Sequence, residues 1–131
     1  MAAIAKSGSP SLSTAIPPTT NSLSGLYAGE AIFSGDPCYI KTSDGKVYRS
    51  NGTAANAAAV VDGFAMADCP IGEALSLYWG VNMRYGAGLN PGTFAYLDTT
   101  AGGLSDAPTT GGTVPIGRVI DSTRIWVRKS Y

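Results

Sequence analysis

The side chains able to do chemistry in this sequence are few, and their types argue against covalent catalysis. The chain has no histidine, which removes the Ser-His-Asp and Cys-His arrangements that activate a nucleophile. Cys38 lies in a strand-like run and Cys69 precedes Pro70, without a neighbouring cation that would lower either thiol pKa. We therefore expect two reduced, packing cysteines, no metal site and no cofactor, because zinc normally takes four ligands.

Carboxylates are the remaining candidates for catalysis. Glycoside hydrolysis uses two of them, and the candidates here are Asp36, Asp62, Asp68 and Glu73. Most of these acids stand beside glycine or proline, where an aspartate usually serves a turn. A small hydrolase that uses Asp62 and Asp68 is a minor alternative, and the main expectation is a protein that is not an enzyme.

Size and charge narrow the class further. The 131 residues suit one domain, and only 14% of them are charged, below the usual quarter. Nine basic residues balance nine acidic ones without a run of either sign, so we expect no direct nucleic-acid partner. No apolar run approaches the ~20 residues of a membrane helix. No signal-peptide pattern opens the chain either, which predicts a product of the cytoplasm.

The positions that could carry function must be held by β-structure. Short apolar runs separated by turn residues predict strands, among them the pair 37–42 and 46–49 around Asp44-Gly45. Further strands are expected at 30–34, 60–66, 73–81, 93–97, 115–120 and 124–128. No helical period is sustained, so the fold class is all-β, a small barrel or sandwich.

The sequence also repeats itself. The spacing from Gly35 to Tyr39 recurs from Gly92 to Tyr96, a shift of 57 positions. Gly45 and Val47 recur as Gly102 and Leu104 at the same shift, and the run 60–65 resembles 114–119 at a shift of 54. We interpret the chain from residue 26 to 131 as a single β domain with an internal pseudo-repeat.

Residues 1–25 have a different composition, rich in Ser, Thr, Ala and Pro. Their sizeable apolar side chains are Ile4, Leu12, Ile16 and Leu23, whose burial would contribute roughly 6–12 kcal/mol. Ordering about 25 backbone residues costs on the order of 25–50 kcal/mol. The segment is therefore predicted to be a disordered tail or an extended arm that binds another surface through these four residues.

Three aromatic residues are candidates for contact with another subunit or a partner. Alternation along residues 73–81 places Trp79 inward and Tyr78 outward, and Tyr85 is taken with Tyr78 as a contact residue. Trp126 shares one side of the last strand with Arg124 and Arg128. A carbohydrate- or receptor-binding head-fibre module, with Tyr78, Tyr85 and Trp126 stacking on sugars, is the main alternative function.

The order of these motifs resembles a known family. The motifs are, in order, Gly25…Gly29-Glu30, Gly35-Asp36-Pro37-x-Tyr39, Asp44-Gly45-Lys46-Val47-Tyr48, Val61-x-Gly63-Phe64-Ala65, Gly72-Glu73, Gly92-x-x-x-Tyr96-Leu97, Gly103-Leu104 and Pro115-Ile116-Gly117-Arg118. In this order, over residues 25–128, they resemble the tailed-phage capsid decoration proteins, the head cement proteins of a prophage domain-of-unknown-function group. The N-terminal arm matches only in its Ser/Thr/Pro character, and the alanine run 54–59 has no place in the family pattern.

The resemblance implies a small β-barrel or β-tulip-like subunit, usually a homotrimer, on the outside of an icosahedral head. Its partner would be the major capsid protein, whose lattice it would fasten after expansion. The expected location is the exterior of the virion, after synthesis in the cytoplasm of the host bacterium.

Overall fold

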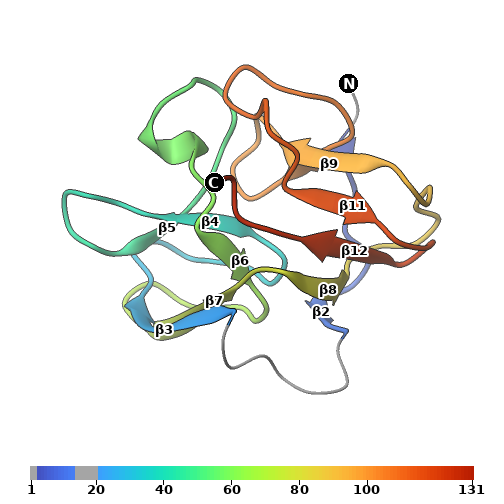
Figure 1. Cartoon of the computed structure of the whole chain (residues 1–131). Coiled ribbons are helices and arrows are strands. Elements are labelled where there is room, and N and C mark those ends of the chain that lie inside the picture. The colour runs from blue at the N-terminus through green and yellow to red at the C-terminus, as the bar shows by residue number, and fades with distance from the viewer. Residues whose placement is uncertain (1–2, 14–20) are drawn as a thin grey trace.

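The computed structural model describes residues 3–13 and 21–131, which form twelve strands in two antiparallel sheets and one short 3-10 helix (Figure 1). The small sheet has the order β3-β7-β6-β4-β5, with bounds Ser22–Tyr27, Ala74–Tyr78, Gly63–Ala65, Pro37–Ile40 and Val47–Arg49. The helix η1 (Ala57–Ala59) occupies part of the alanine run. β3 begins at Ser22, so the β domain starts before the predicted boundary at residue 26.

The large sheet has the order β1-β10-β9-β11-β12-β8-β2. Its bounds are Ala3–Ile4, Leu104–Ser105, Phe94–Leu97, Gly117–Val119, Arg124–Val127, Val81–Arg84 and Ser11–Leu12. The all-β prediction is confirmed. The closed barrel is not formed, because the strands divide between two separate sheets.

The repeated spacing corresponds to repeated strand pairing. β4 lies between β5 and β6 with Ile40 opposite Val47, and β9 lies between β10 and β11 with Leu97 opposite Leu104. β7 then extends the first unit and β12 the second, which gives the matching orders β5-β4-β6-β7 and β10-β9-β11-β12. We call these the first and second units; the chain thus uses one four-stranded arrangement twice.

Glycine holds the equivalent turns of the two units. Gly35 and Gly92 both have φ of 85°, in the left-handed region that side chains with a Cβ rarely adopt. The Gly35 N–H donates to the Ala65 carbonyl at 2.6 Å, and the Gly92 N–H donates to the Val119 carbonyl at 2.8 Å. The sequence repeat therefore fixes turn geometry as well as strand order.

The N-terminal segment 3–13 lies on both edges of the large sheet. β1 pairs with β10 at one edge and β2 pairs with β8 at the other, and Figure 1 shows the blue chain between them passing behind β11 and β12. The seven residue steps from Ile4 to Ser11 reach at most about 25 Å. Seven flat strands would separate β1 from β2 by about 29 Å, so the sheet must curve.

The expected free arm is therefore corrected for residues 3–13. The burial estimate omitted the hydrogen bonds that unpaired sheet edges supply, such as Ser7 N–H to the Tyr85 carbonyl at 3.0 Å and Ser13 N–H to the Asn82 carbonyl at 2.8 Å. Pro10 is buried and a Cβ on Gly35 would lie 2.6 Å from its ring. The segment is ordered by its own domain and needs no second surface.

Two apolar clusters follow from this layering. The larger one joins the inner side of the large sheet, including Leu97 and Ile125, to Phe64 of β6 in the small sheet. The smaller one lies on the opposite side of the small sheet, where Leu77 and Cys38 pack against Ile32. Phe64 and its neighbour Ala65 thus point into different clusters, as successive residues of a strand do.

Candidate functional site

The outer side of the large sheet carries an exposed row of aromatic and polar side chains, one from each of four adjacent strands. Phe94 of β9 lies opposite Arg118 of β11, Arg118 opposite Trp126 of β12, and Trp126 opposite Asn82 of β8. Phe94 is 46% exposed and Trp126 is 39% exposed. The alternation of each strand places Val119, Ile125 and Val127 in the core, which leaves this row on the surface.

Four of the five arginines of the chain lie on these outer positions. Arg118 and Arg128 flank Trp126 across and along the strands, and Arg84 lies opposite Arg124. Arg124 donates from Nε to Asp121 Oδ2 at 2.8 Å. In the described ranges no carboxylate comes within ion-pair distance of Arg84, Arg118 or Arg128.

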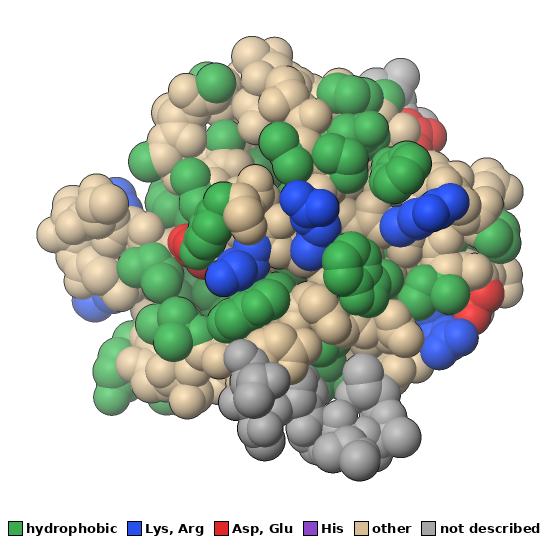
Figure 2. All heavy atoms as spheres, viewed as in Figure 1, with side chains coloured by type: hydrophobic (Ala, Val, Ile, Leu, Met, Phe, Trp, Pro, Cys, Tyr) green, Lys and Arg blue, Asp and Glu red, His purple; other side chains and the backbone are tan. Residues whose placement is uncertain are grey.

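We call this surface the arginine face, defined as Asn82, Arg84, Phe94, Arg118, Trp126 and Arg128. It contains a hollow of about 630 Å³, to which Ile120 and Pro115 also contribute. Figure 2 shows basic side chains among hydrophobic ones over β11 and β12. The face can bind an anionic group while covering apolar atoms, and it offers no nucleophile or general base.

One contact organises the arginine face internally. The Arg118 guanidinium lies 5.1 Å from the centre of the Phe94 ring, within the range of a cation–π interaction. Arg118 is exposed, so its N–H groups remain accessible while the ring limits its motion. The side chain is therefore held in place before a partner arrives.

The equivalent face of the first unit is covered. The pairing that joins Phe94 to Arg118 and Arg118 to Trp126 corresponds to Pro37 opposite Phe64 and Phe64 opposite Tyr78. Phe64 is fully buried in the large cluster, against the inner side of the second unit. The arginine face is thus the outer, uncovered side of the second unit. Arg118 on this face occupies the position that the buried Phe64 has in the first unit.

The structure distributes the predicted arm residues over the protein's own surface. Ile4 and Leu12 are half-buried and pack against the large cluster, in β1 and β2 respectively. Leu23 lies in β3 and is 41% exposed. Ile16 lies outside the described residues. Ile4 and Leu12 are therefore not free to fill pockets of another protein, and they do not form one site with Leu23.

The predicted contact residues also separate. Trp126 is exposed within the arginine face, whereas Tyr85 is 1% exposed and cannot contact a partner from this position. Tyr85 is buried because it continues the alternation of β8, with Met83 inward and Arg84 outward. Tyr78 is half-buried against the large cluster, and Trp79 is half-buried with the Lys129 Nζ 4.4 Å from its ring centre.

The candidate catalytic acids serve the fold. Asp62 accepts from the Ile40 N–H at 2.8 Å and from the Tyr131 hydroxyl at 2.6 Å. The second bond raises the pKa of Tyr131 to about 12. Asp68 accepts from the Ser34 N–H at 2.9 Å. Each carboxylate is thus occupied in holding a loop, which leaves the hydrolase alternative without a supporting observation.

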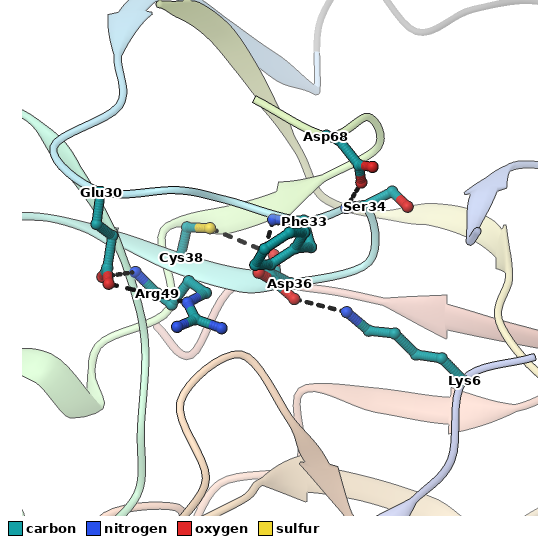
Figure 3. Close-up of polar contacts among 8 residues, drawn as sticks. All are labelled: Lys6, Glu30, Phe33, Ser34, Asp36, Cys38, Arg49 and Asp68. Carbon is teal, nitrogen blue, oxygen red and sulfur yellow. Dashed lines mark hydrogen bonds and ion pairs between the residues drawn. The ribbon is translucent and has the colours of Figure 1, made fainter. Parts of the chain in front are cut away.

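The most buried acid, Asp36, joins the arm to the small sheet (Figure 3). Its Oδ1 accepts from Lys6 Nζ at 2.6 Å and its Oδ2 from the Phe33 N–H at 2.9 Å. Desolvation by burial raises the pKa of Asp36 above its ordinary value, against the lowering effect of the Lys6 hydrogen bond. This pair fixes the middle of the segment between β1 and β2.

A second polar contact lies beside it. The Arg49 backbone N–H donates to Glu30 Oε2 at 2.9 Å, and its guanidinium lies 5.6 Å from the Phe33 ring centre (Figure 3). Arg49 Nε is buried and has no hydrogen-bond partner in the part of the chain that is described, with Glu30 Oε1 3.9 Å away. These contacts position loops and do not converge on a cavity.

Neither thiol is arranged for reactivity. Cys38 and Cys69 are both free and buried in the smaller cluster, and burial raises the pKa of each thiol. Within residues 3–13 and 21–131, no three potential metal-ligating side chains lie together. The same part of the chain contains no helix of the length and apolarity needed to cross a membrane.

Comparison of the chain with models of protein families, with curated proteins and with solved structures finds no match. The features that bear on function are therefore the arginine face, the scaffold that holds it and the sequence resemblance. The signal for the face was present in the alternation of residues 124–128, where two arginines and Trp126 share one side. Phe94, Arg84 and Arg118 join them only through strand pairing.

Proposed function

We propose that this protein is a structural subunit that decorates the exterior of a tailed-phage capsid and stabilises the lattice of the major capsid protein. The observation that carries the proposal is the uncovered arginine face, on a scaffold whose inner sheet surfaces pack on each other and whose N-terminal segment pairs with β10 and β8. The order of the sequence motifs supports the assignment to a phage head. On this proposal the protein is a non-enzymatic component of the virion, made in the host bacterial cytoplasm.

The attachment surface in this proposal is the large sheet. Residues 3–13 are held by β8, β10 and Asp36, so the role that sequence composition gave to the arm passes to the arginine face. A subunit that binds only the assembled lattice stabilises that lattice by mass action. Joining subunits as homotrimers, as the resembling family does, would raise the effective concentration of each contact.

Purified undecorated phage heads provide the test. The full chain should sediment with heads in saturable amounts and raise the temperature at which they release DNA. Sedimentation of the free protein at micromolar concentration should give a trimer. Failure of the full chain to bind any head that carries the matching major capsid protein would refute decoration, and a stable monomer would refute trimerisation before binding.

Carbohydrate binding by a head-fibre module is the second candidate. Its supporting observation is the exposed Trp126 ring opposite Asn82, since an indole face and an amide can stack on and hydrogen-bond a sugar. A glycan array with Trp126→Ala as the control distinguishes the two functions. Saturable glycan binding that requires Trp126, without binding to heads, would favour this candidate.

A further inference from the structure

We infer that the arginine face receives an extended, carboxylate-bearing segment of a partner protein, with an apolar side chain of that segment on Trp126. The identification of this partner as the major capsid protein rests on the proposed function. The chemistry of the segment rests on the face itself.

The charges on the arginine face favour an anionic partner. Arg84, Arg118 and Arg128 have no ion-pair partner in the described part of the chain, while Arg124 already binds Asp121. The cations of the arginine face are all arginines, whose planar guanidinium groups bind carboxylates through two parallel hydrogen bonds. Isolated exposed arginines are common, but the three unpaired ones of the arginine face, beside the exposed rings of Phe94 and Trp126, form a complementary surface for acids and apolar groups together.

The internal repeat shows that this outer face can be covered. In the first unit the corresponding position to Arg118 is Phe64, which is buried against the second unit. A second copy of the chain could not cover the arginine face in the same way, because the inner side of its second unit already packs on its own Phe64. The exchange of phenylalanine for arginine indicates a covering segment that carries carboxylates.

The spacing on the face fits an extended chain. Arg128 lies two residues beyond Trp126, directly after the end of β12, a separation of about 7 Å, and Arg118 lies opposite Trp126 at about 5 Å. Successive side chains on one side of an extended segment are also separated by about 7 Å. A segment that runs along β12 with an apolar residue on Trp126 would therefore place an acid two positions away near Arg128, with Arg118 beside the apolar residue across the sheet.

The neutral balance of the whole chain argues against nucleic acid as the occupant. Nine basic and nine acidic residues leave no net charge, whereas nucleic-acid binding draws on an extended basic surface that displaces counterions. The excess of arginine is confined to one face. Short-range pairing with carboxylates needs no wider field.

The direct test uses the full chain and the synthetic peptide Glu-Thr-Leu-Thr-Glu flanked by Thr-Ser repeats, followed by Trp fluorescence and calorimetry. The wild type should bind it, with affinity falling as salt rises. The double variant Arg118→Gln/Arg128→Gln should bind at least ten-fold more weakly. The matched control Lys41→Gln/Lys46→Gln removes two exposed cations from the connection between β4 and β5 of the small sheet and should bind like the wild type.

Three outcomes would overturn the inference. The first is absence of binding by the wild type, or equal binding of the peptide with Gln in place of Glu. The second is tighter binding of oligothymidine, which would make nucleic acid the occupant. The third is loss of self-association in Arg118→Gln/Arg128→Gln with unchanged near-UV circular dichroism, which would make a second copy the occupant.

Binding of the same variants to undecorated heads separates this inference from the proposed function. Heads that bind the wild type but not Arg118→Gln/Arg128→Gln support both. Heads that bind the two proteins equally overturn docking through the arginine face and leave decoration intact. Heads that bind neither protein overturn decoration, and the peptide measurement then decides the inference alone.

Discussion

Two glycines at equivalent turns of the repeat have different surroundings, which gives a matched pair of substitutions. Gly45 and Gly102 have φ of 70° and 76°, but a Cβ on Gly45 meets nothing within 4 Å, whereas one on Gly102 would lie 2.9 Å from the Asp36 carboxyl carbon. Gly45→Ala should cost about 1–2 kcal/mol from the left-handed backbone alone. Gly102→Ala should cost roughly 1–3 kcal/mol more, because Asp36 is fixed and cannot yield.

Urea unfolding of both variants beside the wild type measures the difference. Equal losses of unfolding free energy would show that the Asp36 contact is absent in solution. Because the two glycines share a turn conformation, the comparison removes the backbone contribution that complicates most glycine substitutions.

Two acids should have opposite effects on stability at low pH. Hydrogen bonds from Thr123 and Arg124 lower the pKa of Asp121 to about 2, so its contribution is lost as pH falls from about 4 towards 2. Burial raises the pKa of Asp36, so the folded state binds a proton more readily than the unfolded chain. Its contribution to stability is therefore present below pH 3.8 and falls as pH rises through the folded pKa.

The measurement is the urea midpoint of each variant between pH 2 and 6. Asp121→Asn should make the acid-side loss of stability shallower, and Asp36→Asn should make it steeper, whatever each substitution does to stability at pH 7. The same sign of change in both variants would contradict the opposite environments of the two carboxyls.

Alternation along single strands predicted part of the site at residue level. It placed Trp126 and Arg128 on one side of the last strand, and they lie together on the arginine face. The same alternation, continued from Met83 of β8, places Tyr85 in the core, where it lies. Phe94 and Arg118 could not be assigned to the face from sequence, because their meeting with Trp126 depends on the pairing of three strands.

At the scale of elements, the N-terminal segment is the clearest case for experiment. The amide of Ser13 donates to Asn82 of β8 and that of Ser7 to Tyr85, the residue after β8, so hydrogen exchange of the free protein should show both as protected. Lys6→Met should speed their exchange and cost roughly 1–3 kcal/mol, because it leaves the buried Asp36 carboxylate without its cation. Lys46→Met, at an exposed position, is the control.

A wild-type protein in which both serine amides exchange at the rate of an unfolded peptide would contradict the pairing of β2 with β8. The second variant, Lys6→Met/Asp36→Asn, should recover part of the lost stability, because it removes the unpaired charge. Recovery would distinguish the ion pair from simple loss of packing by the lysine side chain.

The repeat predicted the central strands, while the two-residue strands β1 and β2 had no detectable pattern. A two-residue element shows no periodicity, and its order comes from the edges of β10 and β8, which lie far away in sequence. In an isolated segment of this composition, apolar burial would not offset the entropy cost of ordering the backbone. Residues 3–13 are nevertheless ordered, because the fold provides two unpaired strand edges within reach of one short chain.

At the scale of the whole molecule, the sequence could not predict which sheet face would stay uncovered. Both units have the same strand pairing. The period-two alternation identifies the two faces of each strand but does not show which face another layer covers. The first unit is buried on both sides and the second on one. This asymmetry, absent from either unit alone, produces the arginine face.

The layering also makes the two sheets depend on one another, and Phe64 is the side chain that tests this. It belongs to the small sheet but is fully buried in the cluster formed by the large one. Phe64→Ala should cost roughly 3–5 kcal/mol through lost burial and the cavity it leaves. Phe94→Ala, at an exposed position of the second unit, should cost less than about 1 kcal/mol.

Both variants should unfold in one transition, with coincident curves from far-UV circular dichroism and from the fluorescence of Trp79 and Trp126. Separate transitions for the two probes in Phe64→Ala would show that the two sheets unfold independently. A loss of unfolding free energy in Phe64→Ala no larger than that in Phe94→Ala would show that Phe64 does not lie on a covered face.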